Sequence, residues 1–424
     1  MKKVIEMLKA NGRVNDWKIN LHRRESSELF FVKGELDCVR RTDTTNNRVT
    51  VYVDHDGFRG DSMFYMYPST TDEEMEKNIN DAVNRAMLIK NPPYSLAEAV
   101  EGSYELESNF SEWDSLALAK EVGKTALGAV EIEGTAINSL EVFITKHSEE
   151  IITSSGVHKS QTRYDAMVEA IPTYNGEKES VELYEQYNFA SYEPEKLREE
   201  IAKKMAEVKA RYEAVPSAGE LSCPVVIGPT ELRQLFYVLV DDLDYANVYS
   251  SSNLRSKGER VQPEGIGDPL DIRLCGSLPG SMRSSRFDID GVELGTLSLI
   301  EKGVAAAYHG SNRFGQYIGE KPSGILPCME VGCGSLSSGE LDAAPWLELI
   351  SMSGLQAELF SDYIGGEVRL AYLHEGEKIT PLTGLSVSGK ISEVLAGIRF
   401  SDKAVLSGGY FGPDKALLPG MKIF

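Results

Sequence analysis

The sequence has little histidine, and this scarcity excludes one common type of hydrolase. Only six histidines occur among 424 residues: His22, His55, His147, His158, His309 and His374. None lies four or five residues from another, so the H-E-x-x-H helix of a zinc peptidase is absent. The one His-Glu pair, His374-Glu375, occurs in HEGEK, where Lys378 or Ile379 would have to be the second ligand. We therefore expect a solvent-facing turn there.

The chain also has few basic residues and lacks an apolar run long enough to span a membrane. Lys and Arg number 44 against 65 Asp and Glu, which gives a net charge of -21. A strongly acidic chain repels phosphate backbones, so no nucleic-acid partner is expected. The N-terminal stretch MKKVIEMLKANGRVND has no continuous apolar segment and is expected to form a short amphipathic helix. No membrane association and a cytoplasmic location follow as expectations.

The five cysteines are expected to be reduced, because an odd number in a large chain without an export signal is typical of the cytosol. Cys328 and Cys333 have a loose C-x4-C spacing without a second Cys/His pair, so we expect buried free thiols and no metal site. The sequence contains no G-x-S-x-G motif, but a Ser or Cys nucleophile could still be assembled from distant residues.

Hydrophobic patterning predicts an α+β fold that begins with an antiparallel sheet and helices. Apolar and polar residues alternate in short segments separated by turn signals, at residues 17–22, 29–32, 35–40, 48–54 and 59–65. Thr71 and Glu74 form a capping box before a helical apolar stripe. These features predict an N-terminal α+β domain over residues 1–95.

Two further units are predicted after this domain. Residues 105–218 form a middle α+β region, in which Pro194 begins a long helix over residues 194–213. Residues 222–424 are rich in glycine and β-branched residues, with hairpin signals at Asp290-Gly291, Lys302-Gly303 and Glu375-Gly376. This composition predicts a β-rich, barrel-like C-terminal domain.

A helix predicted after Pro229 ends in an acidic stretch that includes Asp241, Asp242, Asp244 and Tyr245. The C-terminus of a helix carries partial negative charge, so carboxylates there require a cation, a basic peptide or donor N–H groups. The alternative is that the helix ends early, near Leu239, and that the aspartates cap the next turn.

Ordered blocks in the last unit resemble the TldD/PmbA family, whose members are described as modulators of DNA gyrase and as peptide-maturation proteases. The matching blocks are VVIGPTELRQLFYVLV (225–240), VYSSSNLRSKGERV (248–261), GDPLDIR (267–273) and SRFDIDGVELGTLSLIEKGVAAAY (285–308). The N-terminal segment ESSELFFVKGELD (25–37) is also compatible with the family. The order and spacing of the blocks make the resemblance specific, and the chain most resembles the PmbA-type, or TldE-type, member, which lacks the zinc-protease motif.

The resemblance has one departure that changes what it implies. The protease member carries an H-E-x-x-x-H helix and a distant cysteine ligand, whereas the equivalent segment here is VLVDDLDYAN and the C-terminal tail has no cysteine. No catalytic or metal-ligating residue is therefore assigned, zinc is not expected, and residues 241, 242, 244 and 245 are interpreted as a degenerate active-site helix. The resemblance implies a bacterial cytoplasmic dimer, either a homodimer or a heterodimer with a TldD-like protease, that handles unfolded peptides. A stand-alone peptide-binding homodimer and a hydrolase with a non-metal nucleophile remain as alternatives.

Overall fold

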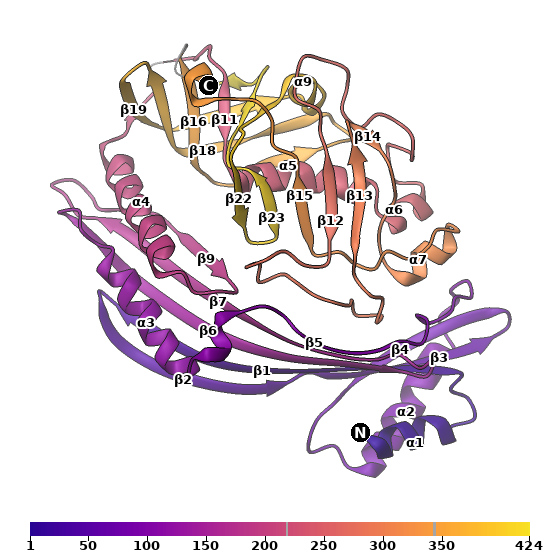
Figure 1. The fold of residues 1–424 in the computed structure, drawn as a ribbon. Helices are drawn as coiled ribbons and strands as arrows, with labels where there is room; N and C mark the ends of the chain where they lie inside the picture. The colour runs from indigo at the N-terminus through magenta and orange to yellow at the C-terminus, as the bar shows by residue number, and fades with distance from the viewer. Residues whose placement is uncertain (218, 342–344) are drawn as a thin grey trace.

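The chain folds into a curved N-terminal sheet that faces a sheet-rich C-terminal half (Figure 1). The computed structural model describes residues 1–217, 219–341 and 345–424. Residue 218, the predicted end of the middle region, lies outside these ranges. Helices and strands occur together throughout both halves, which confirms the predicted α+β class. None of the helices in the described ranges has the length and apolar character needed to span a bilayer.

Nine strands form the N-terminal sheet, in the order β4-β3-β1-β6-β7-β5, with β2 paired to β1 and with β8 and β9 paired to β7. The strands are β1 (Asp16–Val32), β2 (Glu35–Thr45), β3 (Asn47–His55), β4 (Phe58–Met66), β5 (Glu101–Glu105), β6 (Thr135–Thr153), β7 (His158–Tyr174), β8 (Val181–Glu182) and β9 (Glu185–Phe189). The helices of this half are α1 (Lys2–Ala10), α2 (Asp72–Ala86), the short 3-10 helix η1 (Asn109–Glu112), α3 (Ser115–Gly128) and α4 (Pro194–Glu213).

The predicted starts of two helices are confirmed. The Thr71 side chain accepts the backbone N–H of Glu74, and the Glu74 carboxylate accepts that of Thr71, so the capping box begins α2 as expected. Helix α4 spans the predicted residues 194–213, with Pro194 in its first turn. Local sequence signals were sufficient at both positions because the groups that stabilise each helix start lie within a few residues of each other.

Two predicted strand segments, residues 17–22 and 29–32, form one continuous strand of 17 residues, β1. The prediction of a break between them was wrong, because the polar residues of the intervening segment have partners on β2. Arg23 forms an ion pair with Asp43, and buried Glu28 pairs with Arg40. Strand β1 then pairs with β6 along residues 18–32. Strands from the predicted units 1–95 and 105–218 therefore share one sheet.

The period-two geometry of the strands gives this sheet two different faces. Trp17 and Ile19 of β1 join the apolar core formed with α1 and α2. Leu140 and Val142 of β6 join the core formed with α3 and α4. The alternate side chains are largely polar and point to the other face. Figure 1 shows the C-terminal half above the sheet and α1 and α2 below it.

The C-terminal half contains a ten-stranded and a six-stranded sheet. The larger follows the order β10-β19-β18-β16-β11-β24-β21, with β17 and β20 also paired to β18 and with β25 paired to β20. Its strands are β10 (Val215–Pro216), β11 (Val225–Ile227), β16 (Trp346–Met352), β17 (Gln356–Glu358), β18 (Tyr363–Glu375), β19 (Lys378–Thr383), β20 (Leu385–Gly389), β21 (Arg399–Phe400), β24 (Ala416–Leu418) and β25 (Lys422–Ile423).

The smaller sheet follows the order β14-β13-β12-β15-β23-β22. Its strands are β12 (Ile272–Cys275), β13 (Thr296–Glu301), β14 (Val304–Ala305), β15 (Cys328–Val331), β22 (Ala404–Ser407) and β23 (Tyr410–Pro413). The helices are α5 (Pro229–Asp242), α6 (Tyr245–Ser250), α7 (Asn312–Tyr317), α8 (Ser338–Leu341) and α9 (Ile391–Gly397). Phe236 of α5 is fully buried in a core shared with Leu347 of the larger sheet and Leu274 of the smaller.

The loop before β13 connects the two halves of the molecule. Lys18 forms an ion pair with Asp290, and the Asn20 amide donates to the Ile289 carbonyl. A small apolar cluster lies beside these contacts, where Phe287 packs with Ile151 and Val157. The polar face of the N-terminal sheet, which alternation alone would assign to solvent, is therefore partly covered by the C-terminal half.

Candidate functional site

A cavity of about 650 Å³ lies between the polar face of the N-terminal sheet and the loop before β13. Its lining includes His22, Glu149 and Arg163 from the sheet. Phe287 and Ile325 line it from the C-terminal half. Because both halves contribute to the walls, the relative position of the two halves determines the shape of this site.

Strand register brings the polar side chains of the site together. His22 of β1 lies opposite Glu149 of β6, and Glu149 lies opposite Gln161 of β7. Two pairs further along the same two strands, His147 lies opposite Arg163. His147 and Glu149 are two residues apart on one strand, so their side chains point to the same face. The sheet thus presents two imidazoles and a carboxylate side by side.

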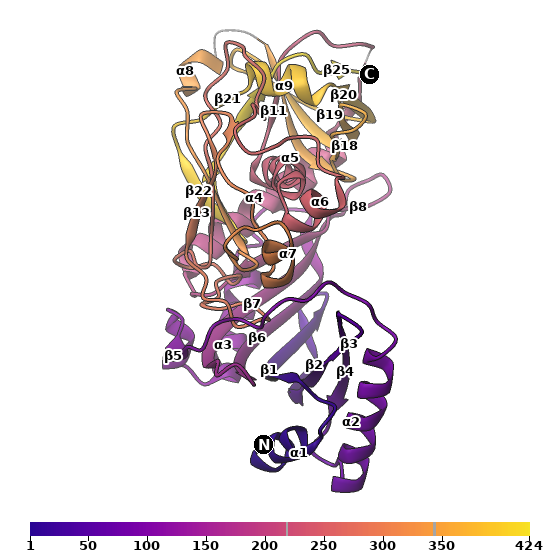
Figure 2. The same ribbon diagram turned by 90° about the vertical axis from the view of Figure 1, so that its right-hand side faces the viewer.

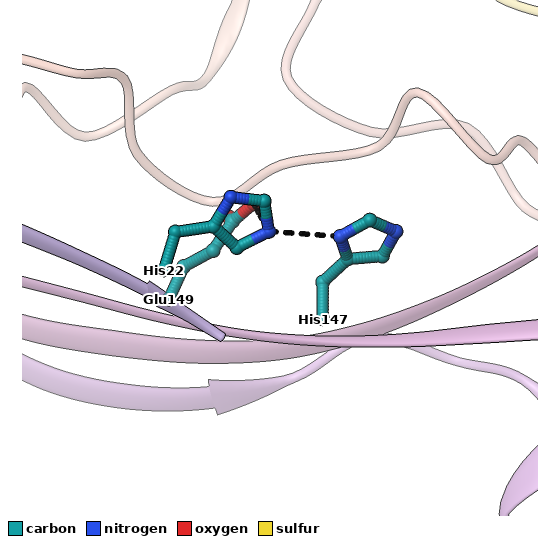
Figure 3. A group of neighbouring side chains, drawn as sticks. All are labelled: His22, His147 and Glu149. Carbon is teal, nitrogen blue, oxygen red and sulfur yellow. Dashed lines mark hydrogen bonds and ion pairs between the residues drawn. The ribbon is translucent and has the colours of Figure 1, made fainter. Parts of the chain in front are cut away.

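The three side chains are directed at one another (Figure 3). His22 Nε2 lies 2.9 Å from His147 Nδ1 and 3.7 Å from Glu149 Oε1. One ligand atom from each residue lies within 4.8 Å of the other two. His147 is buried, whereas His22 and Glu149 are partly exposed toward the cavity. We refer to His22, His147 and Glu149 as the histidine cluster.

A second layer of polar groups holds the histidine cluster in place. The other ring nitrogen of His147, Nε2, lies 2.6 Å from Asp165 Oδ2. Arg163 donates to Glu149 Oε1 at 3.1 Å from Nη2 and 3.2 Å from Nε, and its Nη1 lies 3.3 Å from Asp165 Oδ2. The Gln161 side chain donates to the other oxygen of Glu149. His147 and Glu149 are thus both held in position by side chains of β7.

Burial and charge act in opposite directions within the histidine cluster. Burial lowers the pKa of His22, and the nearby charges of His147, Arg163 and Arg24 lower it further, although Glu149 opposes this shift. Burial disfavours ionisation of Glu149, but Arg163 and the hydrogen bond from Gln161 hold its pKa below the usual range. The sheet therefore presents an ionised carboxylate beside an imidazole whose neutral form is favoured.

A second cavity, of about 490 Å³, adjoins the first, since Arg163, Met282 and Ser284 line both. Strand β5 borders it through Ser103, Tyr104 and Glu105. In the part of the chain that the structure describes, β5 pairs with β7 alone. An edge strand with one unpaired side thus lies along a hollow that continues from the site.

The predicted acidic stretch lies away from these cavities, at the end of α5. This helix ends at Asp242, three residues beyond the early end considered as the alternative. Asp242 is buried, and its carboxylate accepts the backbone N–H groups of Leu254 at 2.6 Å and Arg255 at 3.0 Å. Asp241 is exposed and accepts the Asn247 side chain. Neither residue is among those described as lining the 650 Å³ cavity.

Asp244 and Tyr245 have structural contacts in the same region. Asp244 is the N-cap of α6 and accepts the N–H of Ala246 at 2.7 Å. The buried Tyr245 hydroxyl donates to the Lys321 carbonyl at 2.9 Å. His309 is adjacent, with its Nε2 2.9 Å from the Val240 carbonyl oxygen, and burial lowers its pKa. The side chains at these positions connect loops to the end of α5.

Two minor expectations are corrected in part. The sequence HEGEK does form the hairpin between β18 and β19, but the His374 ring is not directed to solvent. It stacks on Trp346 with ring centroids 3.8 Å apart and contacts Glu348 at 3.0 Å. Of the two cysteines expected to be buried free thiols, Cys328 is buried and Cys333 is exposed, because Cys328 lies within a strand and Cys333 follows its end.

Short-spacing sequence motifs do not reveal the histidine cluster, because its two histidines are far apart in the chain. His22 and His147 are 125 residues apart in the chain. The available signal was the polar alternation around each histidine, which predicts a strand but not its partner strand. Only the pairing of β1 with β6 brings the two rings together.

The curved sheet faces a C-terminal half whose sequence matches a class of metallopeptidase domains. Residues 220–423 match the PmbA/TldA metallopeptidase C-terminal domain. The C-terminal half of the chain is therefore a domain of the TldD/PmbA family. No curated protein matches it in sequence.

Solved structures share the fold over the whole chain at low sequence identity. TldE from Thermococcus kodakarensis superposes with a TM-score of 0.82 and 14% identity, covering 100% of this chain and 99% of its own. A proposed modulator of a DNA gyrase from Thermotoga maritima superposes with a TM-score of 0.79 and 17% sequence identity, covering 100% of this chain and 99% of its own. Another proposed modulator of DNA gyrase, from Bacteroides thetaiotaomicron, superposes with a TM-score of 0.80 and 14% identity, covering 100% of this chain and 97% of its own.

Proposed function

We propose that this chain is a non-catalytic partner subunit of a TldD-like metalloprotease, and that it helps to bind or thread unfolded peptides for proteolysis or maturation. The observation that carries this proposal is the pair of adjoining cavities between the two halves, bordered by the one-sided edge of β5. The chain would act in the cytoplasm, as a heterodimer with the protease.

The cavities have the shape and chemistry for an extended chain. Their volumes, about 650 and 490 Å³, adjoin through shared lining residues. Ile289 and Ile325 expose about half of their surfaces, 54% and 48%, and both line the larger cavity. Such apolar groups accommodate side chains of an unfolded peptide, and the edge of β5 offers backbone donors and acceptors for strand addition.

The absence of the family's protease ligands supports the non-catalytic part of the proposal. The segment 241–245 contains carboxylates and a tyrosine where the resemblance implies a histidine motif. Asp242 and Tyr245 are engaged by loop backbone groups. Substitution of histidine at these two positions would have to break those contacts before a metal could bind.

The first test is association with a cognate TldD-like protease. The full chain and the protease are co-expressed, co-purified and assayed on an unfolded peptide. We expect a stable complex with higher peptidase activity than either protein alone. A protease that never associates with this chain and is fully active without it contradicts the proposal.

The second test uses the cavity itself. Ile325→Trp narrows the larger cavity, whereas Ile379→Trp alters a similarly exposed position, 55% against 48%, that is not among its lining residues. Binding of a fluorescent unstructured peptide, measured by anisotropy, should weaken at least about tenfold for Ile325→Trp and remain unchanged for Ile379→Trp. Equal binding by both variants places the peptide elsewhere.

The same purified proteins distinguish two alternative functions from the one proposed. A stand-alone peptide-binding homodimer binds peptide without the protease, and light scattering reports the mass of two copies. A hydrolase with a Ser or Cys nucleophile cleaves peptide alone, in the presence of chelator, and is inactivated by serine or thiol reagents.

A further inference from the structure

We propose that the histidine cluster, His22, His147 and Glu149, is a binding site for a divalent transition-metal ion of the zinc class. The site lies on the N-terminal sheet and is distinct from the segment 241–245, where the family resemblance puts the protease ligands. The sequence does not predict zinc for this chain, because the family's ligand motif is absent from that segment, and the histidine cluster is a different set of residues. The proposal does not depend on the peptide-handling function.

The donor atoms have the identity and separation that such an ion requires. Two imidazoles and one carboxylate make up the three-ligand sets of known zinc sites, which leave a fourth position open. Bonds of about 2.0–2.1 Å in tetrahedral geometry separate ligand atoms by roughly 3.3 Å. The distances from His22 Nε2, 2.9 Å to His147 Nδ1 and 3.7 Å to Glu149 Oε1, bracket this value.

Asp165 gives His147 the tautomer that a metal ligand needs. When the ring donates from Nε2 to Asp165 Oδ2 at 2.6 Å, the lone pair remains on Nδ1, which is the atom directed at His22. In known zinc sites, a carboxylate usually accepts a hydrogen bond from the far nitrogen of a ligating histidine and holds the ring in place. With His147 in this tautomer, the proton of the 2.9 Å contact would be donated by His22 Nε2 to the same Nδ1 atom.

Glu149 is also held as a ligating carboxylate would be. Two nitrogens of Arg163 donate to Oε1 and the Gln161 amide donates to Oε2, so three of the about four lone-pair positions of the carboxylate are used. A metal at Oε1 would replace one of the Arg163 contacts, and a metal at Oε2 would take the remaining position. The positive charges of Arg163 and Arg24 oppose a bound cation. Two carboxylates, of Glu149 and Asp165, counter them from the same face.

The open side of the site faces the 650 Å³ cavity, because His22, Glu149 and Asp165 line it. A fourth ligand can therefore be water or an oxygen of a molecule held between the two halves. Side chains of β7 hold His147 and Glu149, whereas the side chain of His22 is 35% exposed. The exposed side of His22 gives an ion a path from the cavity to the other two ligands.

The test is direct binding of Zn²⁺ to the full chain after chelator treatment and removal of the chelator. Calorimetry should show one ion per chain, and Co²⁺ as a second probe should give the visible spectrum of a four-coordinate site with nitrogen and oxygen ligands. His22→Ala should weaken Zn²⁺ binding at least about tenfold. Asp165→Asn should weaken Zn²⁺ binding by about 10–100-fold, as expected for loss of a carboxylate that orients a ligating histidine.

His158→Ala is the matched control. This histidine lies on β7 of the same sheet, is exposed and contacts Glu150, so its loss should leave Zn²⁺ affinity unchanged. Circular dichroism and thermal melting establish that each variant is folded, and His22→Ala keeps the test valid if changes at buried His147 disrupt folding. The proposal is overturned if the chain binds no stoichiometric ion, or if His22→Ala binds it as tightly as the His158→Ala control.

Discussion

Lys18 on the N-terminal sheet forms an ion pair with Asp290 in the C-terminal half, and the two side chains are only 7% and 23% exposed. This pair joins halves of the molecule that are distant in sequence. Its low exposure distinguishes it from ordinary surface ion pairs, because a charge left without its partner there is poorly solvated.

Asp290→Asn should therefore destabilise the chain by roughly 1–3 kcal/mol, since it leaves the Lys18 ammonium shielded and without its charged partner. Urea denaturation measures the change. Lys3→Met is the control, because the Lys3–Asp72 pair is exposed by more than 60% on both sides and should change stability by less than about 0.5 kcal/mol. Equal effects of both substitutions would show that the interdomain pair is no stronger than a surface pair.

The end of α5 gives a second prediction. Asp242→Ala removes the acceptor of two backbone N–H groups, of Leu254 and Arg255, and should cost about 1–3 kcal/mol. Asp241→Ala, at the exposed neighbouring position, should change stability by about 0.5 kcal/mol or less. Thermal denaturation of both variants makes the comparison. A role of Asp242 in peptide handling alone would predict unchanged stability for Asp242→Ala with a loss of binding.

A pH dependence follows from Glu231 in the first turn of α5. Burial raises its pKa to about 7 from an ordinary value of 4.5. The folded state therefore binds the proton of Glu231 more tightly than the unfolded state does. This proton makes its full contribution to the free energy of unfolding below pH 4.5, and the contribution is lost as the pH rises through about 7. Glu231→Gln should remove this loss and be more stable than the wild type at pH 8 by on the order of 1–3 kcal/mol.

The measurement is urea denaturation at pH 5 and pH 8 for both chains. Glu195→Gln, at an exposed position of α4, is the control and should follow the wild type at both values. If the wild type and Glu231→Gln differ by the same amount at both pH values, the carboxyl of Glu231 does not titrate differently in the folded and unfolded states.

Gly60 gives a prediction about packing between β4 and α2. A Cβ atom at this position would lie 1.8 Å from the backbone carbonyl oxygen of Ala86, which cannot move without displacing the end of α2. Gly60→Ala should destabilise the chain by about 3 kcal/mol or more. Gly295→Ala, where nothing lies within 4 Å of the added atom, should be close to neutral. Similar midpoints of thermal unfolding for the two variants would contradict the close approach.

The sequence was sufficient where structure depends on neighbours in the chain. Thr71 and Glu74 are three residues apart and define the start of α2, and Pro194 does the same for α4. Gly34 and Gly57 have positive φ angles and lie in two of the turns that separate the predicted strand segments. In each case the required contacts or backbone angles are local, so residue type alone determines them.

The candidate site could not be predicted in the same way. The alternation around His22 and around His147 indicates two strands, but hydrophobic patterning does not say that β1 pairs with β6 in the register that places His22 opposite Glu149. A shift of that register by one residue would turn His22 to the other face. The sequence pattern of the polar face also does not indicate that the loop of residues 285–294 covers it.

The pairing of β1 with β6 also determines when the N-terminal half can fold. Leu21 pairs with Glu150, so at a synthesis rate of roughly 5–20 residues per second the partner of β1 leaves the ribosome on the order of ten seconds after it. During that interval β1 can form its contacts with β2 and β3, which are close in sequence, while its other edge has no partner. A long exposed edge of this kind is a site for wrong pairing, so the central strand of the sheet is the segment most in need of protection during synthesis.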